Sequence, residues 1–492
     1  MAAPKITIVG AGLGGSLLAI YLARRGYDVH VFERRGDLRR EPIEPGRSIK
    51  LTLAERGLAA LRELGLEEEV KHRLCVPLRG RAVHSANGTV VYQPYGKNDQ
   101  EVIHSFSRND LNGFLLTVGE KEPNLSLHFH QRCVDLDKEH AAALFRDTRT
   151  GQEVRFESDL VIGSDGAFSI VRQIMQRRER ADFQQEFLPW GYKELSIRAT
   201  APGRPAMDRH AFHLWPCGDQ FLFALPNVDG SLCGVCVLPF SGEQSWESLR
   251  TDEEILGLLA ERFGDALPYM PDALPECKSR PISNFITVRT SRWHFKDKVV
   301  LLGDAAHSVV PFYGQGMNAA FEDAAAFNGL LDAHHGNFTK VLPDFQRLRK
   351  TGTDVLAQLS VENFHELRDT VRRPIVTARK RTAIFLNRLF RQHSVPLYTM
   401  ISHTTMPLTE CVEKHQRQER IARTLGLDLV VGLVSLWVRL RALRAAYKAR
   451  KAARRGGPEA ARATVAVPLS EPGWKPPPAA LQESTAETVN TP

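Results

Sequence analysis

Short apolar runs, glycine turns and helical repeats alternate in the N-terminal part of the chain. Ile6–Val9 predicts a buried strand, residues 16–25 repeat apolar positions at helical spacing, and Asp28–Phe32 predicts a second strand. A G-x-G-x-x-G turn, at residues 10–15, joins the first strand to the helix. This order predicts a βαβ unit with parallel strands.

The glycines of this turn and the acid after the second strand are typical of a dinucleotide site. Gly10 suits the tight turn, Gly12 lets the backbone approach a pyrophosphate, and Gly15 permits close helix packing. The helix N-terminus then faces the phosphates. Glu33 can accept both ribose hydroxyls and would repel a 2′-phosphate, which favours FAD or NAD over NADP as the resident nucleotide.

Two later segments narrow the choice to a flavin. Residues 159–172 contain a buried strand followed by Asp165-Gly166, and residues 299–318 contain another strand followed by Gly303-Asp304 and a glycine-rich turn. A carboxylate at a strand end can hold a ribityl chain, and a helix N-terminus can stabilise negative charge on a reduced isoalloxazine.

Residues 185–295 predict a sheet that is antiparallel and open on one face, because several short strands alternate apolar and polar positions. The predicted strands are Tyr192–Arg198, His210–Trp215, Gln220–Leu225 and Ser231–Leu238. His210 and His213 point to opposite faces of such a strand, so we predict no metal site there.

Beyond Phe321 the pattern becomes helical to about residue 452. Asn363 falls on a stripe with Leu356, Leu359 and Leu367, so its amide needs buried partners. Two interpretations are open on the pattern alone: a core asparagine bonded to backbone, or a ligand contact.

The C-terminal part contains an uncharged run, then a basic run and then a polar tail. Leu429–Val438 carries no charge but is too short to span a bilayer, and Arg439–Arg455 carries eight cations. This helix, over residues 427–455, is either an interfacial anchor on anionic lipid or a packed helix with a solvated basic end. Residues 456–492 are rich in Ala, Pro, Glu and Thr, which predicts a disordered tail.

Composition fits a multi-domain enzyme, with 43% hydrophobic and 25% charged residues over 492 positions. The net charge of +8 resides in the basic segment, and no recognition motif accompanies it, so nucleic-acid binding is not expected. Seven scattered cysteines and an immediate first strand predict a reduced, cytoplasmic protein without structural disulfides. Cys233 and Cys236 form a C-x-x-C, but in a strand-like run.

The three glycine segments together resemble the fingerprints of the single-component, FAD-dependent aromatic hydroxylases. This resemblance implies an α/β fold like that of p-hydroxybenzoate hydroxylase: a Rossmann-type FAD-binding domain, an antiparallel-sheet substrate domain and a C-terminal helical region. The boundaries expected are 1–180 with 290–330 for FAD, 181–289 for the substrate sheet and 331–455 for the helices.

Local motifs are similar to those of the kynurenine-hydroxylating members of that family. They include Arg79-Gly80-Arg81, Pro94-Tyr95-Gly96, Pro311-Phe312-Tyr313 and Pro396-Leu397-Tyr398. The resemblance implies that L-kynurenine is the substrate, and that its amino-acid end and ring are held by Arg81, Tyr95, Asn363, Tyr398 and Phe312. It thereby favours the ligand-contact interpretation of Asn363.

The same resemblance implies bound FAD, with NADPH and O2 as co-substrates and a flavin C4a-hydroperoxide as the hydroxylating species. The FAD contacts that it implies are Gly10, Gly12, Gly14, Gly15, Glu33, Arg34, Arg108, Asp165, Asp304, Gly316, Met317 and Asn318. No protein nucleophile and no metal are expected.

A hairpin joins the strands that carry Arg81 and Tyr95. A two-residue loop would place the two side chains on opposite faces. A three-residue loop, Ala86–Gly88, pairs position 81 with 93 and puts Tyr95 beside Arg81. We predict the three-residue loop.

Two alternative functions remain open on the sequence. One is a hydroxylase of the same fold that acts on another anionic aromatic compound. The other is a redox-silent flavoprotein whose basic C-terminal helix binds a membrane or a partner.

Overall fold

The computed structural model describes residues 3–41, 50–85, 88–95, 101–177, 179–201, 203–369 and 395–424. Residues 1–428 form one compact unit. The predicted basic helix at 427–455 and the predicted tail at 456–492 lie outside the described residues.

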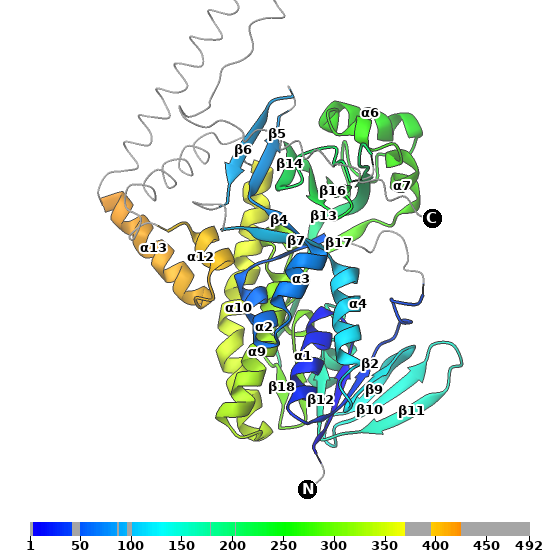
Figure 1. Ribbon diagram of the computed structural model, residues 1–492, viewed down its shortest axis with the longest axis vertical. Coiled ribbons are helices and arrows are strands. Elements are labelled where there is room, and N and C mark those ends of the chain that lie inside the picture. Colours follow the sequence, from blue (N-terminus) through cyan, green and yellow to red (C-terminus); the bar gives the residue numbers. More distant parts are fainter. Residues whose placement is uncertain are drawn as a thin grey trace, which may run out of the picture. The chain divides into compact units, whose positions relative to one another are not determined.

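The predicted βαβ unit is confirmed within a sheet ordered β18-β19-β12-β1-β2-β8 (Figure 1). Its strands are β1 (Lys5–Val9), β2 (Asp28–Phe32), β8 (Leu125–His128), β12 (Leu160–Gly163), β18 (His294–Phe295) and β19 (Val299–Leu301). All neighbours pair in parallel except β18 and β19. The central strands are buried on both faces, as expected of a parallel sheet covered by helices.

Helices from distant parts of the chain pack around this sheet. They are α1 (Leu13–Arg24), α4 (Arg108–Gly119), α5 (Ile170–Gln176), α8 (Asp304–His307) and α9 (Gly316–Ala333). Helix α1 packs against both α4 and α9, and residues along almost its whole length are buried. The first and third glycine segments thus lie at the N-termini of two neighbouring helices.

Two smaller sheets flank the parallel sheet. One is ordered β3-β7-β4 and the other β11-β10-β9. Their strands are β3 (Lys50–Leu53), β4 (Cys75–Leu78), β7 (Ile103–Ser107), β9 (Gln131–Asp137), β10 (Ala142–Asp147) and β11 (Glu153–Glu157). Helices α2 (Glu55–Glu63) and α3 (Glu67–Leu74) follow β3, and α2 packs on α9.

The second large sheet is ordered β17-β13-β16-β15-β14-β5-β6. Its strands are β5 (Gly80–His84), β6 (Val90–Pro94), β13 (Phe183–Ile197), β14 (Ala211–Cys217), β15 (Gln220–Pro226), β16 (Leu232–Pro239) and β17 (Ser283–Thr290). The four predicted strands are confirmed, with Cys233 and Cys236 in β16. Strands β14 and β5 pair in parallel, and all other neighbours pair antiparallel. The sheet takes β5 and β6 from outside residues 181–289.

The prediction that one face of this sheet is open was wrong. Helices α6 (Asp252–Phe263) and α7 (Ala273–Ser279), with the 3-10 turn η1 (Leu267–Tyr269), cover one face and share its apolar cluster. The other face packs against Phe312 and Phe364. Strand β15 is accordingly buried at every position.

Three helices confirm the helical pattern predicted beyond Phe321 within residues 338–369 and 397–424, whereas residues 370–394 lie outside the described residues. They are α10 (Phe338–Asp369), α12 (Leu397–His403) and α13 (Leu408–Thr424). Helix α10, yellow-green in Figure 1, runs beside both large sheets and contacts β14 and β18. Helix α12 packs on α2 and α13, which brings Tyr398 to the pocket described next.

Candidate active site

A pocket lies where the glycine turns of the parallel sheet meet the second sheet. Its glycine-turn end includes Gly12, Gly14, Gly166, Gly303, Asp304, Gly316 and Met317. Its other end includes Arg81, Tyr95, Phe212, Phe223, Phe312, Tyr313 and Tyr398. Lys50 and Arg108 also line it.

Of the four glycines in the turn after β1, only Gly12 leaves room for a ligand. A Cβ on Gly10, whose φ is +103°, would lie 2.5 Å from the Ser164 carbonyl oxygen, and one on Gly15 would lie 2.2 Å from that of Gly10. A Cβ on Gly14 would meet Ala320 and Leu302 at 3.3 Å. A Cβ on Gly12 would meet nothing within 4 Å. Gly10 and Gly15 therefore serve packing, whereas Gly12 borders open space at the N-terminus of α1.

Glu33 lies at the end of β2 beside this turn. One carboxylate oxygen accepts from the Ala11 backbone N–H at 3.1 Å and the other from Arg35 N–H at 3.0 Å. These bonds hold the acid against the glycine turn. Arg34 is exposed and does not line the pocket.

Asp165, between the pocket-lining residues Ser164 and Gly166, has one satisfied and one unsatisfied oxygen. Its Oδ2 accepts from the backbone N–H of Ile170 at 2.7 Å and of Val171 at 3.3 Å. Its Oδ1 is buried and has no partner among the described residues, and burial raises the pKa of the carboxyl. A bound group with a hydroxyl donor would satisfy this oxygen.

The third glycine segment contributes backbone and one acid. Asp304 is exposed and lines the pocket, as do Gly316 and Met317 at the start of α9. Asn318 does not line it, because its amide is used on backbone: Oδ1 accepts from Ala54 N–H, and Nδ2 donates to the carbonyls of Thr52 and Gly314, all at 2.9 Å. Arg108, the first residue of α4, is exposed at the pocket wall.

Taken together, the glycine-turn end suits FAD. Open space at Gly12 suits a pyrophosphate at a helix N-terminus, and Glu33 stands where a ribose would follow. The unsatisfied Asp165 oxygen suits a polyol chain.

Arg81 stands in an aromatic cage at the other end. Its guanidinium carbon lies 5.3 Å from the centre of the Tyr398 ring, 5.5 Å from Tyr95 and 5.8 Å from Phe212. Its Nε donates to the Tyr95 hydroxyl at 3.4 Å. Within the part of the chain that the structure describes, no carboxylate lies at ion-pair distance from it, although Glu366 of α10 interacts with it electrostatically. The arrangement can receive an anion.

The predicted register of the hairpin is confirmed. Arg81 pairs with Gln93, and Ser85 N–H donates to the Thr89 carbonyl, which leaves residues 86–88 as the loop. Gly88 has a φ of +77°. Ala86 and Asn87 lie outside the described residues.

Phe312 and Asn363 are joined directly. Phe312, in the 3-10 turn η2 (Pro311–Tyr313), lines the pocket and packs against the rings of Phe285 and Phe364. The Asn363 Nδ2 donates to the Phe312 carbonyl at 2.6 Å, and Asn363 is not among the lining residues. The backbone-bonded interpretation of this amide therefore describes the structure.

Sequence patterns missed several lining residues. Phe212 pairs with Arg81 in the parallel β14–β5 register, so only the strand pairing brings them together. Phe223 was visible as an apolar position of a predicted strand, but not as a pocket wall. Lys50 lines the pocket, and burial lowers the pKa of its ammonium.

His213 lies in β14 and His210 directly precedes that strand, and the two imidazoles have separate hydrogen-bond partners. His213 bonds to His84 and to the Asp208 carbonyl, each at 2.9 Å, whereas His210 bonds to the Pro77 carbonyl at 3.0 Å.

Over the described ranges, no helix combines the length and apolar character needed to cross a bilayer.

Known proteins share both this sequence and this fold. Residues 4–335 match the FAD binding domain family. Kynurenine 3-monooxygenase from Salinispora tropica is 44% identical over 448 residues, which cover 91% of this chain and 98% of that protein. The enzyme of that name from Myxococcus xanthus is 43% identical and covers 82% and 86%.

Among solved structures, PqsL of Pseudomonas aeruginosa in complex with 2-aminobenzoylacetate has a TM-score of 0.60 at 24% identity, covering 75% of this chain and 98% of that chain. The tetrameric form of 2-methyl-3-hydroxypyridine-5-carboxylic acid oxygenase has a TM-score of 0.59 at 20% identity, covering 76% and 95%. These likenesses show that the chain shares the fold of these two proteins. The chain belongs to the kynurenine 3-monooxygenase family of FAD-dependent hydroxylases.

Proposed function

We propose that the protein is an FAD-dependent monooxygenase that hydroxylates L-kynurenine to 3-hydroxy-L-kynurenine, with NADPH and O2 as co-substrates. The observation that carries this function is a family match that spans nearly the whole chain. The pocket supports it, because a cradle that suits a flavin and a caged guanidinium that suits a carboxylate line the same space.

Arg81 would bind the substrate carboxylate. A guanidinium presents parallel N–H donors to a carboxylate, a geometry that a lysine does not offer. The Tyr95, Tyr398 and Phe212 rings surround the guanidinium, and the two tyrosine hydroxyls would add neutral donors at the same end.

The aromatic ring of the substrate would pack against Phe312. Asn363 would then act through that residue, since its amide fixes the Phe312 carbonyl. Phe223 and Leu225 of the second sheet complete an apolar wall that keeps water from the reacting ring.

Gly12, Gly14, Glu33, Asp165, Asp304, Gly316 and Met317 would hold FAD, with Arg108 at the pocket wall. Bound flavin supplies the activation of O2 with electrons from NADPH. The protein's own share is to align the substrate ring with the flavin and to exclude water.

The test is NADPH consumption by the FAD-loaded protein, with and without L-kynurenine, together with product identification. Substrate-stimulated oxidation that yields 3-hydroxykynurenine is the expected result. Stimulation that yields only hydrogen peroxide would make kynurenine an effector and leave another anionic aromatic as substrate. A flavin that NADPH does not reduce would favour a redox-silent flavoprotein.

A further inference from the structure

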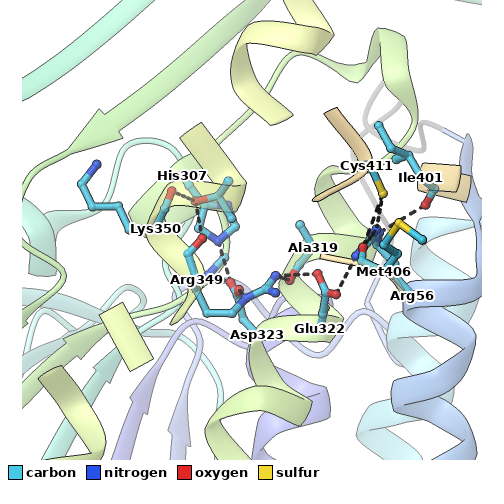
Figure 2. Close-up of polar contacts among 12 residues, drawn as sticks. Arg56, His307, Ala319, Glu322, Asp323, Arg349, Lys350, Ile401, Met406 and Cys411 are labelled. Carbon is cyan, nitrogen blue, oxygen red and sulfur yellow. Dashed lines mark hydrogen bonds and ion pairs between the residues drawn. The ribbon is translucent and has the colours of Figure 1, made fainter. Parts of the chain in front are cut away.

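A chain of buried and partly buried charged side chains links α8, α9, α10 and α2. Figure 2 shows it running from His307 through Asp323, Arg349 and Glu322 to Arg56. Glu322 and Asp323 are neighbours on α9, the helix whose first residues line the pocket. The two acids of the chain therefore lie on the same helix whose first residues border the FAD site.

One end of the chain holds the Gly303 turn. The Oδ2 of Asp323 accepts from His307 Nε2 at 2.6 Å and from the Gly303 backbone N–H at 3.1 Å. Its Oδ1 accepts from Arg349 Nε at 2.7 Å. Although burial alone would raise the pKa of Asp323, its interactions with His307 and Arg349 lower that pKa to about 2, so this carboxylate stays ionised.

The other end holds the C-terminal helices through Arg56 of α2. This guanidinium is 2% exposed and bonds in three directions. It donates to Glu322 Oε1 at 2.8 Å, to the Ile401 carbonyl at 3.2 Å and to the Met406 carbonyl. The Cys411 sulfur lies 3.9 Å from the same guanidinium.

The Ile401 carbonyl belongs to the last turn of α12 (Leu397–His403), where carbonyls lack partners within the helix. Arg56 therefore caps α12 and also ties the loop that follows it. Tyr398 lies one turn earlier on the same helix and stacks beside Tyr95, with ring centres 5.5 Å apart. Any shift of α12 along or around its axis moves the Tyr398 ring relative to Arg81.

We infer that Arg56 is a positioning residue for substrate binding: it fixes α12, and through α12 it fixes Tyr398 in the cage around Arg81. The predicted effect of Arg56 on kynurenine binding rests on the proposed function. Its predicted effect on the stability of α12 does not. Arg56 touches neither substrate nor flavin in this scheme, since it does not line the pocket.

Arginine suits this position for a geometric reason. Its planar guanidinium carries five N–H donors and serves acceptors from different elements at once. Lysine keeps the charge opposite Glu322 but cannot reach the two carbonyls with the same geometry. We therefore expect Arg56→Lys to fall between the native protein and Arg56→Met.

The same helix offers a matched control. Arg62 lies on α2 with its side chain half exposed, and its hydrogen bonds and ion pairs among the described residues go to Glu55 and Glu67, not to the carbonyls that Arg56 binds. Arg62→Met removes an arginine and its two ion pairs from α2, but it leaves in place the bonds from Arg56 to Glu322, Ile401 and Met406. Tm and bound-flavin absorbance of each variant report whether the fold and the FAD site are intact.

The first readout is amide hydrogen exchange of residues 397–403 in the FAD-loaded enzyme without substrate. Arg56→Met should speed this exchange, and Arg62→Met should leave it unchanged. If Arg56→Met does not fold, Arg56→Lys takes its place, with a smaller acceleration expected. Native exchange of these amides in a folded Arg56 variant would overturn the inference, whatever the substrate is.

The second readout is the Kd for L-kynurenine, followed by the change in flavin absorbance. We expect Arg56→Met to raise Kd about tenfold through misplacement of Tyr398. In a double-mutant cycle with Tyr398→Phe, the two effects should be strongly non-additive because they act through one ring. Independent, additive effects would contradict the role. If the native protein itself binds no kynurenine, the proposed function fails. The hydrogen-exchange result still shows whether Arg56 fixes α12.

Discussion

The guanidinium carbon of Arg81 lies 5.3 Å from the centre of the Tyr398 ring, although the two residues are 317 positions apart in the sequence. A ring against the guanidinium face leaves its N–H edge available to an anion. The Arg81 end of the pocket is thus built by β5 and completed by α12.

Arg81 should dominate affinity for the substrate carboxylate. We expect Arg81→Met to raise the KM for L-kynurenine on the order of 100-fold, because charge-assisted hydrogen bonds are lost from a desolvated site. Arg81→Lys should raise KM less than Arg81→Met does, but should recover only about a tenth of the affinity lost, because lysine restores the charge without the bidentate geometry. Steady-state kinetics measure both.

The decarboxylated analogue of kynurenine provides the control. It lacks the group that Arg81 would bind, so native and Arg81→Met proteins should bind it equally. A loss of affinity for the analogue as large as that for kynurenine would show that the substitution damages the pocket in general.

Gly12 and Gly15 should fail in different ways. Gly15→Ala should destabilise the protein even without FAD, because the new methyl would lie 2.2 Å from the Gly10 carbonyl oxygen. Gly12→Val should keep the Tm of the apoprotein but lose FAD, since its side chain enters open space at the α1 N-terminus. Thermal melts with and without FAD separate the two, and equal FAD affinity of Gly12→Val and the native protein would argue against the cradle.

Asn363 should control the use of reducing equivalents more than substrate affinity. Asn363→Leu leaves the Phe312 carbonyl without its amide donor, so Phe312 should hold the substrate ring less firmly. The ratio of hydrogen peroxide to hydroxylated product should rise at saturating kynurenine. The opposite pattern, a large loss of affinity with an unchanged ratio, would place the amide against the substrate itself.

His104 should make the protein less stable in acid. Burial lowers the pKa of this β7 imidazole to about 4, from 6.5 when unfolded. Between these values the unfolded chain binds a proton that the folded chain does not, so stability falls as pH drops through that window. Between pH 7 and pH 5 we expect a loss of about 2 kcal/mol from this group alone.

Denaturant unfolding of the native protein and of His104→Asn at both pH values measures this contribution. The variant lacks the titrating group, so its pH dependence should be smaller by about the same amount. Parallel curves for the two proteins would contradict the assignment to His104.

Local signals predicted the glycine turn after β1 and the strands on either side of it. The turn at Gly10–Gly15 and the strands around it follow from residues close in sequence, and β2 has the predicted ends. The hairpin register followed in the same way from Gly88, whose positive φ fits the three-residue loop.

The substrate half depends on contacts between distant residues. Asn363 and Phe312 are far apart in sequence, and the stripe on α10 gave no sign that the amide would reach that carbonyl. The covered outer face of the second sheet was missed for a different reason. Thr251 and Glu254 form a capping box that starts α6, a local signal that was overlooked among the strands.

The most direct test of the function is the fate of O2. The FAD-loaded protein is supplied with NADPH, L-kynurenine and oxygen gas enriched in oxygen-18, and the product is analysed by mass spectrometry. The account predicts 3-hydroxykynurenine that carries one heavy oxygen atom on its ring. A product whose new oxygen comes from water, or the absence of any hydroxylated product while NADPH is consumed, would contradict it.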